Sequence, residues 1–290
     1  MKIFYHNDPD GQAAGSIVNH FETLNGKRII ECIALTMGTP FPLNIIRPQE
    51  KIYIVDYRPD NWSELFRKTK NVTWIDHHKT SKDNFDEWSK NNKIPKNFDM
   101  LVNMKHAGCA LAWMYFTDSS LPLWLKLVQD FDIFKWEFKD LTKWFINGLS
   151  LEDKKAEDLN SIWYYFLQSS ADIIWDKVEE ISNNGKIITQ YKECRNNELI
   201  QYRYKRYFHG YKCIVLNTRR ACGSEVFTDA GINLNEYDLY ITATYTGSAW
   251  QISLYSNSVD VQELAKTYPG GGGHPGSAGI TFSKEDFPFY

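Results

Sequence analysis

Aspartates and histidines gather at three places in the first 80 residues, and each group directly follows a short apolar run. The three segments are residues 3–11, 51–56 and 72–78. Apolar β-type residues that lead into carboxylate or imidazole side chains are typical of strands that end at the ligand-binding edge of an α/β sheet. Carboxylate and imidazole ligands without a thiolate suit Mn²⁺ and, less well, Mg²⁺, Fe or Co. The three segments together therefore predict a metal site at one edge of a sheet.

The first two segments place three carboxylates where they could share two ions. Asp8 and Asp10 flank a proline that restricts the turn, and Gly11 follows, where the backbone can approach a neighbour closely. Asp56, at the end of another strand, could bridge both ions. A pair of ions about 3.5–4 Å apart can activate water and hold a phosphoryl group. Taken singly, the aspartates have ordinary alternatives as turn or cap residues, and His6 as a hydrogen-bonded structural histidine.

The third segment contains two adjacent histidines. In an extended chain, the side chains of His77 and His78 point to opposite sides. We therefore expect that they do not bind one ion together, and that one binds metal while the other faces the substrate. The residues alone leave open which histidine does which.

A run of four glycines near the C-terminus, residues 270–273, is the second informative site, and His274 follows it. Backbone N–H groups without side chains in the way can form a concave site for an anion. His274 could then donate a hydrogen bond to a phosphate or a base. The alternative is a flexible glycine tail, but the apolar residues 280–282 favour an ordered segment.

Residues 186–212 are rich in basic and aromatic side chains. Seven Lys and Arg residues stand against two Glu, with five Tyr and one Phe among them. Such a mixture can bind single-stranded nucleic acid through charge and stacking. A solvated helix with an apolar stripe explains the stretch equally well.

Length and amino-acid composition are those of an ordinary soluble globular protein. Its 290 residues suffice for two domains, with 43% hydrophobic and 24% charged residues. A formal net charge of −3 argues against stable binding of duplex DNA. Five widely spaced cysteines and the lack of a leader or of a long apolar run predict a reduced, cytoplasmic protein without a membrane segment.

Strand and helix patterns alternate in the first half, which predicts an α/β fold with a parallel, doubly wound sheet. Residues 36–50 are expected to be loop-like, and the polar residues 82–97 to form a surface excursion. Strands are expected at residues 2–5, 28–35, 51–55 and 72–75. Helices are expected from about residue 12 and at residues 61–69, 107–115 and 121–134.

In the second half, a helical pattern at residues 154–183 precedes an expected break at Asn183, Asn184 and Gly185. Thereafter a connecting helix is predicted at residues 186–205, strands at 213–217, 237–244 and 250–255, and short helices at 224–230 and 261–268. We therefore divide the chain into a metal-binding domain, a helical linker and a smaller α/β substrate-binding domain, at residues 1–184, 185–205 and 206–290.

These motifs resemble those of the DHH phosphoesterase superfamily. Residues 6–11 resemble its first motif, Asp56 the second and residues 76–78 the third, while residues 130–132 fall where a fourth aspartate is expected. Residues 250–256, 259–265 and 270–279 resemble its C-terminal partner domain, DHHA1. The opening is most similar to the nano-RNase, or oligoribonuclease, branch, which degrades short RNA.

The resemblance implies two Mn²⁺ ions, replaceable by Mg²⁺ or Co²⁺, in a crevice between the two domains. It also implies that His78 contacts the scissile phosphate and that Asp76 orients the histidines. For the fourth motif we choose Asp130 over Asp132. Residues two apart on a helix point about 200° apart, so the two aspartates cannot serve equally. The implied metal ligands are then His6, Asp8, Asp10, Asp56, His77 and Asp130.

The resemblance also assigns substrate contacts in the second domain. Gly271, Gly272, Gly273 and His274 would hold the far end of the substrate. Several relatives carry an arginine in the preceding strand, where this chain has residues 253–256 without one. Either Arg219 or Arg220 supplies this charge, or the terminal phosphate matters less.

The sequence thus predicts a Mn²⁺-dependent phosphodiesterase that hydrolyses short single-stranded RNA or DNA oligonucleotides to nucleoside monophosphates. The alternatives are a cyclic or linear dinucleotide phosphodiesterase, a 3′-phosphoadenosine 5′-phosphate phosphatase, and, from another class, a catalytically weak nucleotide-binding regulatory module. A RecJ-like exonuclease for longer strands is less favoured by the negative net charge. Whether two copies form a homodimer is left open.

Overall fold

The computed structural model describes residues 1–27, 31–36, 39–219 and 222–289. It separates into two compact units, Met1–Thr189 and Gln190–Tyr290. The division falls within one long helix, α8, Ala171–Leu199. No helix in the described ranges is both long enough and apolar enough to cross a membrane.

The first unit is built on a five-stranded sheet in the order β2-β1-β3-β4-β5, and all of its neighbouring strands are parallel. This confirms the predicted parallel sheet. Residues 28–30 of the second expected strand lie outside the described residues. The strands are β1 Lys2–His6, β2 Glu31–Leu35, β3 Ile52–Val55, β4 Val72–Asp76 and β5 Phe98–Val102.

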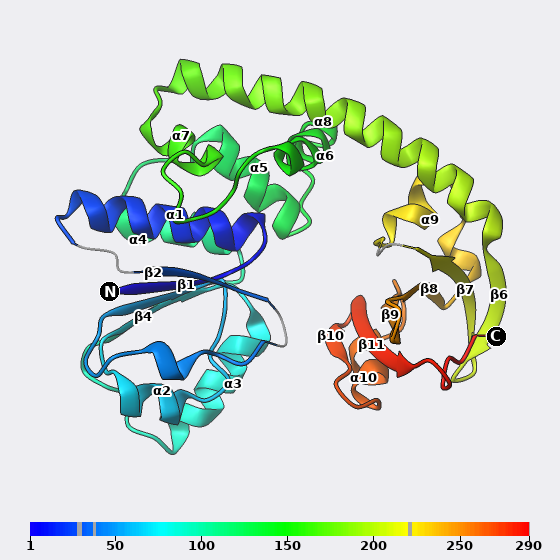
Figure 1. The fold of residues 1–290 in the computed structure, drawn as a ribbon, viewed down its shortest axis with the longest axis horizontal. Helices are drawn as coiled ribbons and strands as arrows, with labels where there is room; N and C mark the ends of the chain where they lie inside the picture. Colours follow the sequence, from blue (N-terminus) through cyan, green and yellow to red (C-terminus); the bar gives the residue numbers. More distant parts are fainter. Residues whose placement is uncertain (28–30, 37–38, 220–221, 290) are drawn as a thin grey trace. The chain divides into compact units, whose positions relative to one another are not determined.

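Helices cover both faces of this sheet (Figure 1). One face carries α1, Pro9–Leu24, and α4, Gly108–Phe116, while α2, Trp62–Lys68, and α3, Lys79–Lys90, lie on the other. The alternation of side chains along β1 explains the two cores, because Ile3 and Tyr5 belong to one cluster of buried residues and Phe4 to the other. The sheet is therefore doubly wound, as predicted.

The polar residues 82–97, expected to form a surface excursion, instead contain most of α3 and the loop that connects it to β5. The helix buries only Ser81 and Phe85, so its sequence lacks the apolar stripe that would have revealed it. The edge strand β5 is likewise half exposed along its length. A short 3₁₀ turn, η1 Leu43–Ile45, interrupts the loop expected at residues 36–50.

The remainder of the first unit is helical. Its helices are α5 Leu123–Asp132, α6 Asp140–Gly148, α7 Ile162–Gln168 and α8, with a 3₁₀ turn η2 Leu149–Leu151. Of these, α6 was not predicted. The helix expected at residues 154–183 does not include residues 154–161, and the rest of it is two helices that meet near Ser169.

The expected break at Asn183, Asn184 and Gly185 is wrong, because α8 continues through all three residues. Gly185 has another reason to lack a side chain. A Cβ atom there would lie 1.7 Å from the carbonyl oxygen of Trp144 in α6. The glycine therefore allows α6 and α8 to pack closely instead of ending a helix.

The connecting helix also ends earlier than predicted. Helix α8 stops at Leu199, the 3₁₀ turn η3 follows at Ile200–Tyr202, and β6 begins at Tyr204. The last two residues of the expected helical linker therefore lie in a strand. Tyrosine and basic residues alternate from residue 202 to 205, which is a short strand-like pattern that the basic composition obscured.

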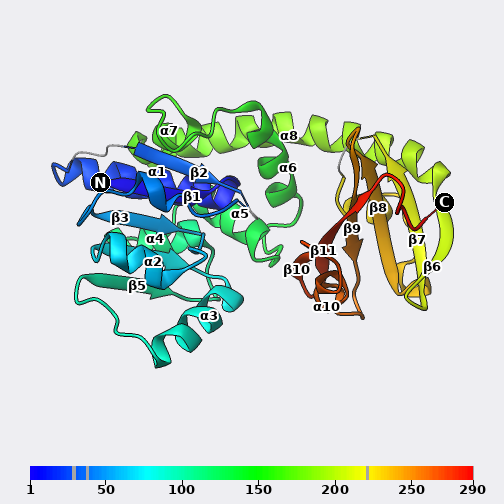
Figure 2. The same cartoon turned by 60° about the horizontal axis from the view of Figure 1, so that its bottom comes forward.

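The second unit is a six-stranded sheet in the order β10-β11-β9-β8-β7-β6 (Figure 2). Only β7 and β8 are parallel to each other among the described pairs. Strands β6, β10 and β11 were not predicted. The elements are β6 Tyr204–Phe208, β7 Tyr211–Thr218, α9 Glu225–Asp229, η4 Leu234–Glu236, β8 Leu239–Tyr245, β9 Ala249–Tyr255, α10 Val261–Lys266, β10 Gly272–His274 and β11 Ser277–Ser283.

Candidate metal centre

The candidate site lies where β1, β3 and β4 end. Because these strands are parallel, their carboxyl ends meet at one edge of the first sheet. Asp8 caps α1, with its Oδ1 accepting a hydrogen bond of 2.9 Å from the Gly11 N–H. Asp56 directly follows β3, and its φ of 51° turns the chain at the sheet edge. Asp76 is the last residue of β4.

Seven acidic and imidazole side chains converge there in three overlapping groups. Within each group, the potential ligand atoms lie within 4.8 Å of one another. Asp56 belongs to two of the groups and His77 to two, so the three groups form one continuous cluster. The groups are His6 with Asp8 and Asp56, Asp56 with His77 and His78, and Asp10 with His77 and Asp132.

The distances show how tightly the cluster is built. His6 Nδ1 lies 2.7 Å from Asp8 Oδ2 and 3.6 Å from Asp56 Oδ2. His77 Nε2 lies 3.1 Å from Asp56 Oδ1, 3.3 Å from Asp132 Oδ2 and 3.7 Å from Asp10 Oδ2. One imidazole nitrogen thus faces three carboxylates.

The two adjacent histidines do not point to opposite sides, contrary to our expectation. His77 Nε2 and His78 Nδ1 lie 3.1 and 3.7 Å from the same atom, Asp56 Oδ1. Their ring centroids are 4.4 Å apart. The alternation of an extended chain does not apply, because β4 ends at Asp76 and His78 already caps α3.

Asp76 holds this turn. Its Oδ1 accepts hydrogen bonds from the backbone N–H groups of His77 at 2.7 Å and His78 at 3.2 Å, and lies 2.8 Å from His78 Nδ1. Burial by itself would lower the pKa of His78, but the hydrogen bond and charge of Asp76 outweigh burial and raise it. Asp76 therefore fixes the orientation of the His78 ring.

For the fourth motif, the structure places Asp132 in the cluster and Asp130 outside it, which reverses our choice. The carboxylate of Asp130 is buried and accepts hydrogen bonds from Glu137 N at 2.7 Å, from Phe138 N at 3.2 Å and from the hydroxyl of Thr142. Helical spacing correctly separates the two side chains. It does not reveal that the loop after α5 folds back onto the first of them.

Two residues that the sequence analysis did not single out position Asp10. The backbone N–H groups of Gly108 and Cys109, at the start of α4, donate to Asp10 Oδ2 at 2.7 Å and Oδ1 at 2.8 Å. A Cβ atom on Gly108 would lie 2.8 Å from Asp56 Cβ, so only glycine lets the helix approach this closely. The signal in the sequence was a glycine in the first turn of a predicted helix.

Crowding of carboxylates dominates the electrostatics of the cluster. Burial, followed by the charges of Asp10 and Asp56, raises the pKa of Asp132 to about 9. Burial and the charge of Asp10 also raise the pKa of Asp56 well above its usual range. Burial lowers the pKa of His6, but hydrogen bonds to Asp56 and Asp8 outweigh it and raise that pKa to about 10. The cluster therefore calls for compensating positive charge.

The donor set fits divalent cations. Asp56 Oδ1 and Asp132 Oδ2 are buried oxygens without a hydrogen-bond partner among the described residues, so both are available to an ion. Burial raises the pKa of the neighbouring Cys109 thiol well above its usual range, which keeps it protonated and outside the ligand set. Hard oxygen and imidazole donors of this kind suit Mn²⁺ or Mg²⁺.

The glycine run in the second unit is part of an ordered hairpin, β10–β11. Gly273 has a φ of 151°, and a Cβ atom on it would lie 2.4 Å from the Ser277 carbonyl oxygen. A Cβ atom on Gly271 would lie 2.1 Å from the Ala265 carbonyl oxygen at the end of α10. Gly272, in contrast, has open space where a side chain would be. Two of the three glycines are therefore required by the backbone itself.

Three further residues were predicted to contact the substrate: Arg219, Arg220 and His274. Arg219 is exposed just after β7. Arg220 lies outside the described residues. The backbone of His274 pairs with Ser277 in the hairpin, but its side chain is outside the described part of the chain. Their contribution to substrate binding stays a prediction.

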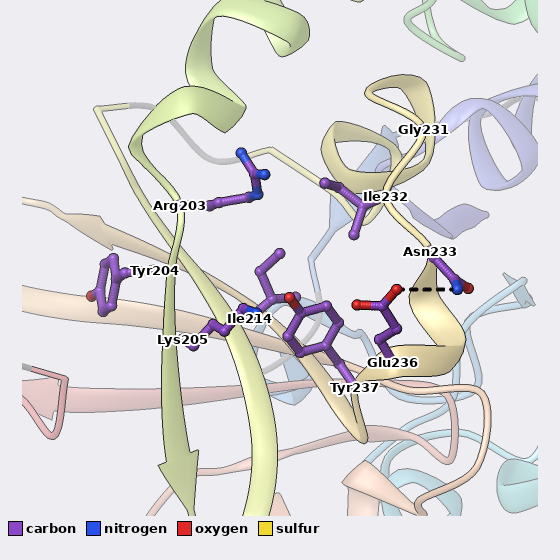
Figure 3. Close-up of a pocket in the computed structure, with 9 residues that line it drawn as sticks. All are labelled: Arg203, Tyr204, Lys205, Ile214, Gly231, Ile232, Asn233, Glu236 and Tyr237. Carbon is purple, nitrogen blue, oxygen red and sulfur yellow. Dashed lines mark hydrogen bonds between the residues drawn. The ribbon is translucent and has the colours of Figure 1, made fainter.

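The basic stretch at residues 186–212 is divided between α8 and the β6–β7 hairpin. The hairpin borders a cavity of about 560 Å³ in the second unit (Figure 3). Arg203 and Lys205 stand on its strand side, and Asn233 and Glu236 face them from η4. The cavity is lined by Arg203, Tyr204, Lys205, Ile214, Gly231, Ile232, Asn233, Glu236 and Tyr237.

Comparison with known proteins places the fold. No family model matches the chain, and no curated protein matches it in sequence. Among solved structures, the pGpG-specific phosphodiesterase PggH from Vibrio cholerae is 14% identical with a TM-score of 0.52, over 98% of this chain and 94% of that one. A manganese-bound exonuclease RecJ is 15% identical with a TM-score of 0.53, over 99% of this chain and 86% of that one.

RecJ from Thermus thermophilus in complex with Mn²⁺ gives a similar result. It is 15% identical with a TM-score of 0.52, and this chain spans 50% of its length. The chain therefore shares the mixed α/β fold of RecJ, which confirms the predicted fold class. At these identities, the likeness establishes the fold alone.

Proposed function

We propose that the chain is a Mn²⁺-dependent phosphodiesterase of the DHH superfamily, which hydrolyses short single-stranded oligonucleotides, nanoRNA above all, to nucleoside monophosphates. The observation that carries this proposal is the cluster of four aspartates and three histidines at the end of three parallel strands, in which Asp56 belongs to two ligand groups. The fold shared with RecJ and PggH supports it. By their descriptions, PggH is a phosphodiesterase and RecJ is an exonuclease.

In this proposal, two overlapping sets of ligands hold two ions. His6, Asp8 and Asp56 hold the first, and Asp10, Asp56, His77 and Asp132 hold the second. When bound, the ions supply positive charge that lowers the pKa of a water molecule and stabilises charge on the phosphoryl oxygens. Two backbone N–H groups of helix α4 donate to Asp10, so its carboxylate keeps its orientation with or without a bound ion.

His78 is the residue that we assign to the scissile phosphate. Asp76 engages its Nδ1 and keeps the pKa of the ring raised, so the imidazolium form is favoured. A cationic donor held beside Asp56 can stabilise the negative charge that develops on a phosphoryl oxygen. In the second unit, we assign the far end of the substrate to the β10–β11 hairpin with His274, and a supporting charge to Arg219.

A linear dinucleotide phosphodiesterase is the second candidate. PggH, whose fold the chain shares over nearly its whole length, is described as specific for pGpG. Hydrolysis of cyclic dinucleotides or of 3′-phosphoadenosine 5′-phosphate would use the same cluster. A nucleotide-binding module without turnover is the candidate from another class, although a protein that only binds nucleotides has no evident use for two metal-ligand groups.

A substrate panel tests these candidates. End-labelled oligonucleotides of two to 24 residues, pGpG, a cyclic dinucleotide and the bisphosphate nucleotide are incubated with Mn²⁺, with and without excess EDTA. We expect EDTA-sensitive release of mononucleotides, fastest from the shortest oligonucleotides. Turnover of pGpG alone would select the second candidate. Nucleotide binding that resists EDTA, with no turnover of any substrate, would contradict the proposal.

A further inference from the structure

The loop between α5 and α6, residues 133–139, has an unusual backbone. Phe134, Trp136 and Lys139 have φ values of 55°, 56° and 51°. Residues other than glycine rarely adopt this left-handed region, and three within six positions are a concentration of local strain. Such strain persists only where surrounding contacts impose it, and it is found most often at functional sites.

The side chain of Asp130 is what imposes this backbone. Its two carboxylate oxygens accept hydrogen bonds from the N–H groups of Glu137 and Phe138 and from the hydroxyl of Thr142. A turn at the other end of the loop is closed by the N–H of Lys135, which donates to the Asp130 carbonyl oxygen at 3.1 Å. A single buried residue therefore holds the loop from both ends.

The loop presents aromatic rings to the outside instead of burying them. The Phe134 side chain is 75% exposed and that of Trp136 is 38% exposed. The ring of Phe131, which is partly buried, lies 6.4 Å from the first and 5.8 Å from the second, centroid to centroid. Three rings thus form a small aromatic surface, which we call the aromatic loop.

The aromatic loop follows directly on a residue of the candidate metal centre. Asp132, whose Oδ2 lies 3.3 Å from His77 Nε2, precedes Phe134 by two residues. Two peptide units span at most about 7 Å between Cα atoms. The aromatic loop therefore begins within one nucleotide's length of the cluster, and both belong to the same unit.

We propose that Phe134 and Trp136 form a stacking platform for the nucleobase next to the scissile phosphate. This inference rests on the proposed function and specifies how the site recognises its substrate. A nucleobase is the occupant that fits, because a flat aromatic ring stacks on Phe or Trp whatever its hydrogen-bonding groups. The position beside the cluster sets the base adjacent to the phosphate that is cut.

The platform gives the enzyme a means of selecting nucleotides over other phosphodiesters. The cluster itself contacts only the phosphate, which all phosphodiesters share. Stacking contributes about 1–3 kcal/mol per base, which corresponds to roughly 5-fold to 150-fold in binding. Asp130 is a positioning residue in this scheme, since it acts through the loop.

The test compares substrates with and without the base. Phe134→Ala and Trp136→Ala are assayed on an adenine dinucleotide and on the same dinucleotide with its bases removed. We expect each variant to lose about 10-fold or more in kcat/KM on the intact dinucleotide and to be nearly unchanged on the abasic one. Phe134→Tyr and Trp136→Phe should retain most activity. Trp175→Ala, which removes a 57% exposed ring from α8, is the matched control.

Direct binding separates this inference from the proposed function. Affinity for the intact and abasic dinucleotides is measured with Ca²⁺ in place of Mn²⁺, using a labelled substrate. If the protein binds the dinucleotide through Phe134 but hydrolyses nothing, the platform stands and the proposed hydrolysis fails. If wild type hydrolyses both substrates equally well, or if the variants lose both activities equally, the platform is overturned.

Discussion

Three side chains of the candidate metal centre are each directed by a neighbour that is not itself a proposed ligand. The N-terminus of α4 directs Asp10, the Gly11 N–H directs Asp8, and Asp76 directs His78. Such contacts determine ligand orientation and are often as important for metal binding as the ligands themselves. At the scale of single residues, the site is therefore arranged before any ion binds.

Asp56 is the residue whose loss should be most damaging. It belongs to two ligand groups, and its Oδ1 is buried without a hydrogen-bond partner among the described residues. We expect Asp56→Ala to lower kcat by at least about 10³-fold while the fold is kept, because repulsion among the remaining carboxylates falls. The measurements are Mn²⁺-dependent hydrolysis and thermal unfolding. Asp83→Ala on α3 is the control, and a near-normal rate for Asp56→Ala would argue against a shared ligand.

Asp130 and Asp132 should respond to mutation in different ways. Asp132→Ala should abolish Mn²⁺-dependent turnover without loss of stability, because its Oδ2 faces the crowded carboxylates around His77. Asp130→Ala should destabilise the protein by about 1–3 kcal/mol, since it leaves buried N–H groups without an acceptor. Urea unfolding and Mn²⁺ titration of both variants decide between them. A stable, inactive Asp130→Ala that binds one ion fewer would restore the original choice.

The stability of the metal-free protein should fall as the pH rises. In the folded state the pKa of Asp132 is raised from 3.8 to about 9. A carboxyl group with a raised folded-state pKa contributes stability below its unfolded pKa, and that stability is lost as the pH rises towards 9. We expect the unfolding temperature without metal to decrease between about pH 6 and pH 8.5, and added Mg²⁺ to raise it more at the higher pH.

The control for this prediction is Asp132→Asn, which removes the titrating group. Its unfolding temperature without metal should depend less on pH over the same range. Identical pH profiles for wild type and variant would show that other groups dominate.

At the scale of secondary-structure elements, two glycines determine how helices approach their neighbours. Gly108 allows α4 to reach Asp10 and Asp56, and Gly185 allows α8 to cross α6. In both cases the glycine lies within a helix, where its backbone freedom is a disadvantage. Close packing against a neighbouring segment is therefore the physical reason why both positions are glycine.

Gly185→Ala should destabilise the protein although alanine is the better helix former. The Cβ atom would lie 1.7 Å from the Trp144 carbonyl oxygen, so α6 and α8 would have to separate. Overpacking of this kind costs about 1–3 kcal/mol, which exceeds the gain of about 1 kcal/mol from helix propensity. Asn183→Ala, exposed on the same helix, should instead be neutral or slightly stabilising. Urea unfolding of both variants is the measurement, and a stabilised Gly185→Ala would contradict this packing.

At the scale of the whole molecule, the proposed function makes net charge and its distribution decisive for substrate length. The chain carries a formal net charge of −3, yet Arg203 and Lys205, at the start of the β6–β7 hairpin, line a cavity of the second unit. A small site that contacts few phosphates gains little from longer strands, whereas an extended basic track gains with each phosphate. Salt dependence distinguishes the two.

We expect the salt dependence of kcat/KM to be shallow and similar for a dinucleotide and a 24-mer. Each phosphate contacted by a single strand contributes a slope of about −0.7 in a plot of log kcat/KM against log salt concentration. The double variant Arg203→Ala and Lys205→Ala should then leave the 24-mer slope unchanged. A steeper slope for the 24-mer that this variant abolishes would show that the basic stretch binds nucleic acid.

The sequence by itself determined the parallel sheet and named most of the side chains that meet in the candidate metal centre. Apolar strands that end in Asp8, Asp56 and Asp76 can be recognised locally, and parallel pairing necessarily brings their carboxyl ends to one edge. His6, Asp10 and both histidines of the third motif follow from the same reasoning. These features depend on the order of residues along the chain and on general sheet geometry.

Only the tertiary structure decided the features that depend on contacts between distant segments. The choice of Asp132 over Asp130 depends on a loop that folds back to Glu137 and Phe138, and the turn at His77 depends on where α3 begins. The continuity of α8 depends on a crossing with α6, because a glycine signals a break and a close packing contact equally well. Local patterns specify which residues end a strand, but non-local packing specifies which way their side chains face.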